Sequence, residues 1–182
     1  MNKLIFALIA TVTAMGAAHA EGAYVGLGVA TSDHSFKIGS NVKAEGYKPS
    51  VKVFGGVDLT PMFGIEAGYT DLRKADHTYT IGNINGRTTT EGQRAYLAGK
   101  ATLPLNDAFS VYGKLGAGYS KVEFSNAIAG RDDSKTELYG ALGGQYNLSK
   151  QVALTLEYER YGKTKDFGAK ADAISVGARY NF

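Results

Sequence analysis

The segment ISVGARYNF, Ile174–Phe182, ends the chain and alternates between two kinds of side chain. One face carries Ile174, Val176, Ala178, Tyr180 and Phe182, and the other carries Ser175, Gly177, Arg179 and Asn181. A period of two residues is typical of a β-strand with an apolar side and a polar side. The fold therefore depends on which of these sides faces the surroundings of the protein.

Seven earlier segments alternate in the same way, at residues 23–29, 50–59, 63–69, 94–103, 109–119, 137–146 and 152–159. Short links lie around residues 60–61, 104–107 and 147–150, whereas the long polar links are Thr31–Lys48, Asp71–Gly92, Lys121–Lys135 and Tyr161–Ala171. Alternating short and long links are typical of an up-and-down antiparallel meander with all long loops at one end. The sequence therefore predicts an all-β fold of eight strands.

The apolar faces of these strands carry no charged residue, whereas the opposite faces carry charges of both signs: Lys52, Arg94, Lys100, Lys114 and Arg179 against Asp58, Glu66, Glu137, Glu157 and Glu159. The opposite faces are otherwise rich in glycine, serine, alanine and tyrosine, which suits a narrow filled lumen better than a surface in water. A charge on a lipid-facing strand costs about 2–4 kcal/mol at the bilayer midplane. We therefore expect a transmembrane barrel with its apolar side outward.

Aromatic residues near the strand ends of the apolar face favour the same interpretation, because membrane barrels carry aromatic girdles at both interfaces. These residues are Phe63, Tyr69, Phe109, Tyr119, Tyr146, Tyr158, Tyr180 and Phe182. A closed barrel also satisfies every backbone hydrogen bond within the hydrocarbon, which an open sheet cannot do.

The first twenty residues have the layout of a secretory signal peptide: Lys3, an apolar run from Leu4, and small residues up to Ala20. We expect cleavage after Ala20, so residues 1–20 are predicted to be a signal peptide and residues 21–182 the barrel domain. Because an exported chain is predicted to form a membrane barrel, we expect the protein to be located in the bacterial outer membrane. The chain has no cysteine, and without residues 1–20 it has 19 basic and 17 acidic residues, a balance that argues against nucleic acid as a partner.

Several motifs in order resemble the OmpA-type eight-stranded outer-membrane barrel: Phe54-Gly55-Gly56, Pro61, Gly64–Tyr69, Lys100 to Pro104, Val111–Gly116, Leu156-Glu157-Tyr158 and Val176–Phe182. The resemblance covers nearly all of the chain after residue 20. It implies that the termini and short turns lie in the periplasm and the long loops outside. It also implies insertion by the barrel-assembly machinery, which reads a C-terminal aromatic strand such as the one with Tyr180 and Phe182. The peptidoglycan-binding activity of OmpA itself is not expected here.

The resemblance further implies an ion pair inside the barrel that can gate a small channel. Glu66 and Lys100 take the positions of the family's interior glutamate and lysine, within a predicted lumen network that also holds Lys114, Glu157 and Arg179. The positions of the second acid and of the arginine are occupied by Gln145 and Thr155, which are neutral. The sequence therefore favours a static Glu66–Lys100 pair over a switch.

No pattern predicts a catalytic, cofactor or metal site, so we expect no enzyme activity. His34 and His77 fall in predicted loops, and His34 and Ser35 are adjacent, so on a strand they would point to opposite faces.

Outer-membrane lipids are expected partners. The basic residues Arg160, Lys163 and Lys165 suggest contacts with the phosphate groups of lipopolysaccharide. The leading hypothesis is a structural or adhesin-like role through the long loops, with a host or surface ligand. The alternative is a porin-like narrow channel for water or small ions, gated or blocked by the Glu66–Lys100 pair.

Overall fold

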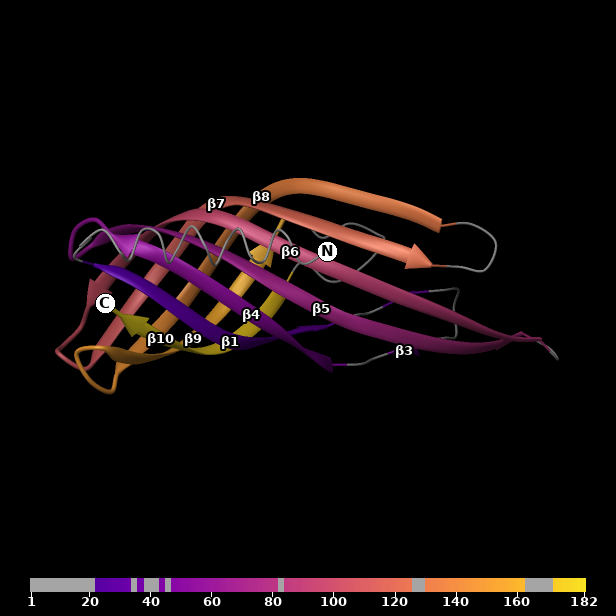
Figure 1. The fold of residues 1–182 in the computed structure, drawn as a ribbon, viewed down its shortest axis with the longest axis horizontal. Helices are drawn as coiled ribbons and strands as arrows, with labels where there is room; N and C mark the ends of the chain where they lie inside the picture. Colours follow the sequence, from indigo (N-terminus) through magenta and orange to yellow (C-terminus); the bar gives the residue numbers. More distant parts are fainter. Residues whose placement is uncertain are drawn as a thin grey trace.

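A computed structural model of the chain describes residues 22–33, 36–37, 43–44, 47–81, 84–125, 130–162 and 172–182. Eight strands form one closed antiparallel barrel in which each strand pairs with its neighbour in sequence and the last returns to the first (Figure 1). The strands are β1 (Ala23–Asp33), β4 (Tyr47–Asp58), β5 (Phe63–Ile81), β6 (Ile84–Pro104), β7 (Phe109–Ser125), β8 (Gly130–Asn147), β9 (Val152–Tyr161) and β10 (Asp172–Asn181). The predicted eight-stranded meander is confirmed, and the predicted signal peptide lies outside the described residues.

The barrel closes between the first and the last strand, in register from Tyr24 opposite Asn181 to Ser32 opposite Ala173. Below this ladder the backbone N–H of Phe182 donates to the carbonyl of Ala23 at 3.0 Å. The alternation in Ile174–Phe182 therefore runs to the end of the chain because the whole segment pairs with β1. The barrel end that holds Gly22 and Phe182 also holds the three short turns, and we call it the short-turn end.

In each short turn, one polar side chain accepts a hydrogen bond from the backbone N–H at the start of the next strand. Thr60 Oγ1 accepts from Phe63 at 2.9 Å, and Asn106 Oδ1 accepts from Phe109 at 2.8 Å. Ser149 Oγ accepts in the same way from Val152 at 3.0 Å. Threonine, asparagine and serine favour such turns because their short side chains reach the backbone two or three residues on. The predicted turns at these positions are confirmed.

The apolar faces of the strands point outward and the charged faces point inward, as predicted. Leu142 and Leu115 on the outside are 70% and 65% exposed, whereas Glu66 and Glu159 on the inside are 2% and 1% exposed. A soluble barrel would show the reverse arrangement, because charged groups are rarely buried without a partner. In the part of the chain that the structure describes, no helix is long and apolar enough to cross a membrane.

The aromatic residues of the outer face lie in two groups. One group lies at the short-turn end and comprises Phe63, Phe109, Tyr146, Tyr180 and Phe182, and the other comprises Tyr69, Tyr119 and Tyr158 further along the strands. Two pairs within the first group are in ring contact: the centroids of Phe109 and Tyr146 are 4.7 Å apart, and those of Tyr180 and Phe182 are 5.4 Å apart. Two aromatic levels separated by aliphatic residues match the girdles that the sequence predicts.

The strands β5 to β8 are much longer than predicted, and this corrects the expectation of irregular loops at Asp71–Gly92 and Lys121–Lys135. The pairs between β5 and β6 continue to Ile81 opposite Ile84, whereas those between β4 and β5 end at Val51 opposite Asp71. The pairs between β7 and β8 continue to Ser125 opposite Gly130. Figure 1 shows both strand pairs projecting beyond the barrel at the end opposite the short turns, which we call the hairpin end.

The link Thr31–Lys48 also contains β-structure. β1 and β4 pair as far as Asp33 opposite Tyr47, and between them the short strands β2 (Phe36–Lys37) and β3 (Lys43–Ala44) form a separate two-stranded sheet that the sequence did not predict. For the link Tyr161–Ala171, residues 163–171 lie outside the described part of the chain.

Candidate functional site: the charged lumen

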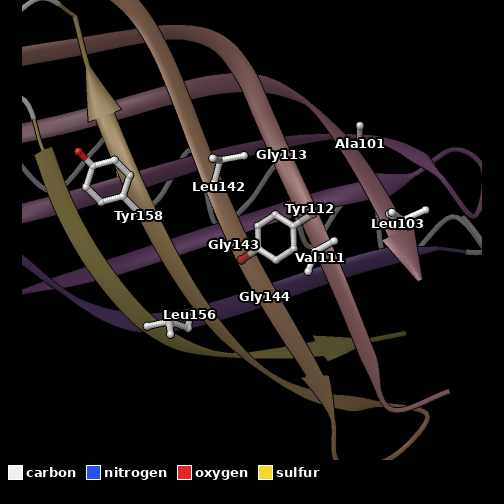
Figure 2. Close-up of a pocket in the computed structure, with 10 residues that line it drawn as sticks. All are labelled: Ala101, Leu103, Val111, Tyr112, Gly113, Leu142, Gly143, Gly144, Leu156 and Tyr158. Carbon is white, nitrogen blue, oxygen red and sulfur yellow. The ribbon is translucent and has the colours of Figure 1, made fainter. Parts of the chain in front are cut away.

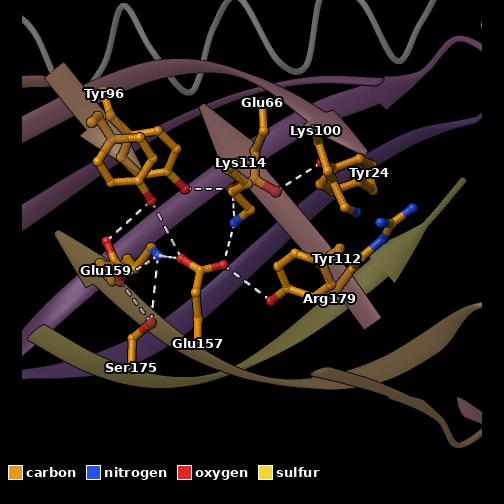
Figure 3. A network of polar contacts seen from close by, with 12 residues as sticks. Tyr24, Glu66, Tyr96, Lys100, Tyr112, Lys114, Glu157, Glu159, Ser175 and Arg179 are labelled. Carbon is orange, nitrogen blue, oxygen red and sulfur yellow. Dashed lines mark hydrogen bonds and ion pairs between the residues drawn. The ribbon is translucent and has the colours of Figure 1, made fainter. Parts of the chain in front are cut away.

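Among the residues whose burial the structure describes, eight charged side chains from six strands are buried in the barrel interior. They are Lys52, Glu66, Arg94, Lys100, Lys114, Glu157, Glu159 and Arg179, each at most 6% exposed. Each occupies an inward position of its strand, because successive residues of a strand point to opposite faces. Figure 3 shows most of them converging with buried tyrosines into one network. All five predicted lumen residues, Glu66, Lys100, Lys114, Glu157 and Arg179, lie in this interior.

Lys114 on β7 lies at the centre of the network. Its ammonium donates to Glu66 Oε1 at 2.6 Å and forms a second close ion pair with Glu157 Oε2. Tyr24 donates its hydroxyl to Glu66 at 2.8 Å, and Tyr96 donates to the other oxygen of the same carboxylate. Both oxygens of Glu66 are thus hydrogen-bonded, as a buried carboxylate requires.

Lys52 on β4 forms a second centre nearer the hairpin end. Its ammonium donates to Glu157 Oε1 at 2.6 Å and to Glu159 Oε1 at 2.7 Å. The hydroxyl groups of Ser175 and Tyr161 donate to Glu159 at 2.7 Å and 3.0 Å. Glu157 therefore links the two centres, because one of its oxygens binds Lys52 and the other binds Lys114.

The short-turn side of the lumen is organised around Asp58. Arg179 forms a close ion pair with Asp58 Oδ2, and its Nε donates to Asn181 Oδ1 at 2.6 Å. The nearest carboxylate oxygen to the Lys100 ammonium is Asp58 Oδ1, at 3.8 Å. The Lys100 ammonium also lies over the rings of Tyr24 and Tyr112, 4.9 Å and 5.0 Å from their centroids.

The predicted Glu66–Lys100 pair is therefore wrong, because Glu66 pairs with Lys114. Lys100 and Lys114 face each other across the β6–β7 ladder, so either lysine can approach the same carboxylate. The tyrosine rings hold Lys100 toward Asp58, which leaves Glu66 to Lys114. Sequence position alone cannot separate two lysines that are direct cross-strand neighbours. At Gln145, a position that the resemblance gave to an acid, the amide oxygen accepts from Arg179 Nη1 at 3.5 Å.

Glycine makes room for the rings that support this network. A Cβ atom at Gly68 would lie 2.3 Å from the Tyr96 ring, and one at Gly26 would lie 2.1 Å from the Phe54 ring. The Tyr96 ring is stacked on that of Tyr139 with centroids 4.3 Å apart, so it has little freedom to move away. The inward glycines are therefore needed because an eight-stranded lumen is just wide enough to be filled by side chains.

The outer face carries a shallow apolar groove of about 600 Å³ across β6 to β9 (Figure 2). Its lining includes leucine, valine and Tyr158 side chains, the glycines Gly113, Gly143 and Gly144, and part of the inward-facing Tyr112. A Cβ atom at Gly144 would meet no atom within 4 Å, so this glycine is not required by packing within the barrel. The groove belongs to the apolar exterior and holds none of the charged residues of the lumen.

Among the residues whose positions the structure gives, no three His, Cys, Asp or Glu side chains are grouped to hold a metal ion. His77 lies on β5, where its backbone faces Thr88, rather than in the predicted irregular loop, and His34 lies outside the described residues.

A closed barrel with an apolar exterior, two aromatic levels and an ion-paired interior defines a β-barrel integral membrane protein. The chain belongs to the family described as outer membrane protein beta-barrel domain, whose profile matches residues 4–182. It is accordingly an outer-membrane protein of the OmpA type.

Two curated relatives support this assignment at the level of sequence. Outer membrane protein A of Klebsiella aerogenes is 30% identical over 135 residues, which cover 71% of this chain and 37% of that protein. The chain thus spans less than two fifths of the length of that relative. The attachment invasion locus protein of Yersinia pseudotuberculosis is 28% identical over 165 residues, which cover 84% of this chain and 86% of that protein.

Solved structures share the fold. The crystal structure of Ail, the attachment invasion locus protein of Yersinia pestis, superposes with a TM-score of 0.61 at 21% identity and covers 89% of this chain and 99% of that one. The N-terminal barrel of Pseudomonas aeruginosa OprF superposes with a TM-score of 0.57 at 13% identity, covering 87% and 97%. At these identities the likeness concerns the barrel architecture alone.

Proposed function

We propose that the protein is a small structural and adhesin-like barrel that presents a binding surface at its hairpin end. The observation that supports this most is the continuation of β5 and β6 beyond the barrel. From Leu72 to Ile81 the strand adds roughly 30 Å at about 3.3 Å per residue. Segments that project from one end of a barrel scaffold are a usual place for binding function.

The proposed orientation places the hairpin end outside the cell and the short-turn end in the periplasm. The resemblance to the OmpA type supports it, and so does the difference in size between the two ends. Arg160, which is exposed on the outer face near the hairpin end, is then a candidate contact for lipopolysaccharide phosphates. In the same proposal the barrel-assembly machinery reads Tyr180 and Phe182 at the end of β10.

The proposed ligand is a host or environmental surface molecule. One solved structure of Yersinia pestis Ail is a complex with sucrose octasulfate, a heparin analogue. A sulfated glycan is therefore a reasonable first probe for this chain. Residues 72–91 contain Arg73, Lys74 and Arg87 against Asp76 and Glu91, so this segment carries a small net positive charge toward such a ligand.

The test replaces residues 73–90 with a short turn that joins β5 to β6 just beyond the barrel. The barrel should still fold, because the lumen network and the β1–β10 closure lie outside the deleted segment. Folding is read as a compact band in electrophoresis that shifts on boiling. Cells that carry the shortened protein should lose binding to immobilised heparin or to host cells.

A matched control shortens the β7–β8 pair at residues 123–132 instead. Loss of binding in the first variant alone assigns the ligand surface to the β5–β6 hairpin. Unchanged binding in both variants, with both barrels folded, would refute the proposal.

A narrow channel for water or small ions is the second candidate, and the observation that favours it is the polar lumen. Against it, the ion pairs of Lys114 and Lys52 occupy the interior. Planar-bilayer recordings of the purified protein separate the two functions. If the channel exists, Lys114→Ala should raise its conductance, because this change removes the side chain that joins Glu66 to Glu157.

A further inference from the structure

We propose that the apolar groove across β6 to β9 is a binding site for one acyl chain of a membrane lipid, which stays bound while the surrounding lipids exchange. This proposal does not depend on the adhesin-like function and requires only that the barrel lies in a membrane. It rests on the shape of the groove, on two glycines that packing within the barrel does not explain, and on the position of the groove between the aromatic levels.

The groove is a depression of about 600 Å³ in the outer wall, with Leu103 on its β6 side and Leu156 and Tyr158 on its β9 side (Figure 2). The leucines beside it stand out from the wall, since Leu142 is 70% and Leu156 58% exposed. Its lining also includes part of Tyr112, whose ring is buried in the lumen. The groove therefore reaches down to the backbone of the barrel wall.

Two glycines in the lining, Gly113 and Gly144, lie at outward positions. A Cβ atom at Gly113 would have its nearest neighbour at 3.5 Å, an ordinary contact distance, and one at Gly144 would meet no atom within 4 Å. The ladders through both glycines run in continuous register, so neither marks a bulge. Glycine weakens a strand and often marks a place where a ligand approaches the backbone closely. A ligand on the outer face explains both glycines and the depression that they line.

The position of the groove identifies the ligand as hydrocarbon. Its β9 side ends at Tyr158, in the aromatic level nearer the hairpin end, and its β6 side ends at Leu103, close to the short-turn end of the strand. It thus lies within the apolar band that the girdles enclose, and it is continuous with the surface that lipid covers. Alanine, valine, leucine and glycine make up most of the lining, so an acyl chain suits it better than water.

A single chain also fits the groove better than a second copy of the barrel. The outer wall of a barrel is convex, so two barrels would meet on protruding side chains such as Leu142 and Leu156 and leave the floor between them uncovered. An acyl chain is narrow and flexible enough to lie on the floor itself. Because the chain leaves other hydrocarbon to bind, its gain comes from close packing against the wall rather than from the hydrophobic effect.

The test measures lipid binding by native mass spectrometry. The folded protein is released from detergent micelles that contain a phosphatidylcholine with bromine on one acyl chain, and the population with one bound lipid is recorded. Gly144→Leu fills the floor and should weaken the affinity about tenfold, because the chain loses on the order of ten close carbon contacts. Gly99→Leu adds the same side chain to the outer face of β6 outside the groove and should leave the affinity unchanged. The band that shifts on boiling verifies that both variants fold.

A second measurement needs no variant. Crystals of the unmodified protein grown from bicelles of the brominated lipid should show anomalous bromine peaks within contact distance of Val111 and Gly144. Equal affinities of Gly144→Leu and the unmodified protein, or an equal loss in Gly99→Leu, would overturn the proposal. A mass of two chains without lipid, or bromine spread evenly over the exterior, would also overturn it.

Discussion

Two adjacent glycines on β8 allow a direct test of which barrel face is packed and which is open. A Cβ atom at Gly143 would lie 2.5 Å from Cζ and 2.6 Å from the hydroxyl oxygen of Tyr112, whereas one at Gly144 would meet no atom within 4 Å. The two positions share one strand and differ only in the face to which they point. Gly143→Ala should therefore destabilise the barrel, and Gly144→Ala should not.

The size of the effect follows from the role of Tyr112. Its ring is 5% exposed, its hydroxyl donates to Glu157 at 3.0 Å, and the ammonium groups of Lys100 and Lys114 each lie 5.0 Å from its centroid. Overpacking typically costs about 1–3 kcal/mol, and losing a hydrogen bond to a charged group costs about 1.5–3 kcal/mol. We expect Gly143→Ala to lower the free energy of unfolding by at least about 2 kcal/mol. Gly144→Ala should raise it by up to about 1 kcal/mol, since alanine loses less chain entropy than glycine.

Urea titration in detergent micelles or bilayers measures both changes. The chain contains no tryptophan, so folding is followed by circular dichroism and by the band that shifts on boiling. Equal losses of stability in the two variants would refute the reasoning, because they would mean that both faces of β8 are equally packed.

Three further predictions test the exterior, the lumen and the C-terminal strand. Leu115→Arg places a charge on the outer face between the two aromatic levels and should lower the free energy of unfolding in a bilayer by about 2–4 kcal/mol. The control Leu105→Arg, in an exposed short turn, should change it little. Equal stability of the two variants would contradict a lipid-facing exterior. Lys114→Met leaves Glu66 without its cation and should lower the free energy of unfolding by about 3–5 kcal/mol. Adding Glu66→Gln to the same chain should restore part of this loss. Urea titration measures both changes, and an unchanged midpoint would show that the ion pairs are not stabilising. Phe182→Ser should slow insertion into membranes that contain the barrel-assembly machinery while leaving the stability of the inserted barrel nearly unchanged; equal insertion rates would argue against the proposed signal.

The inward and outward faces could be predicted from the sequence because each strand alternates strongly within the region that contacts lipid. Val51 and Lys52, or Leu115 and Lys114, differ so much in polarity that one register alone satisfies both faces. The short turns could be predicted for a related reason, since Thr60, Asn106 and Ser149 are residues that accept backbone hydrogen bonds locally.

The length of β5 to β8 could not be predicted in this way. Beyond Asp71 the sequence does not alternate regularly between apolar and polar residues, and the segment from Leu72 to Ile81 has the composition of a loop. The partners of the ion pairs could not be predicted from the sequence either. Lys100 and Lys114 face each other across one ladder, and their different partners depend on side-chain packing against Tyr24 and Tyr112.

The closure between β1 and β10 has a consequence for the order of assembly. β1 is the first strand of the barrel to be synthesised, yet one of its two neighbours is the last, so its second edge remains unsatisfied until the whole chain has been made. Pairing between consecutive strands can begin locally, but the ring is completed only by a contact between the most distant parts of the sequence. The β1–β10 ladder is therefore the pairing with the greatest separation in sequence, and until it forms the β1 edge exposes unpaired backbone groups.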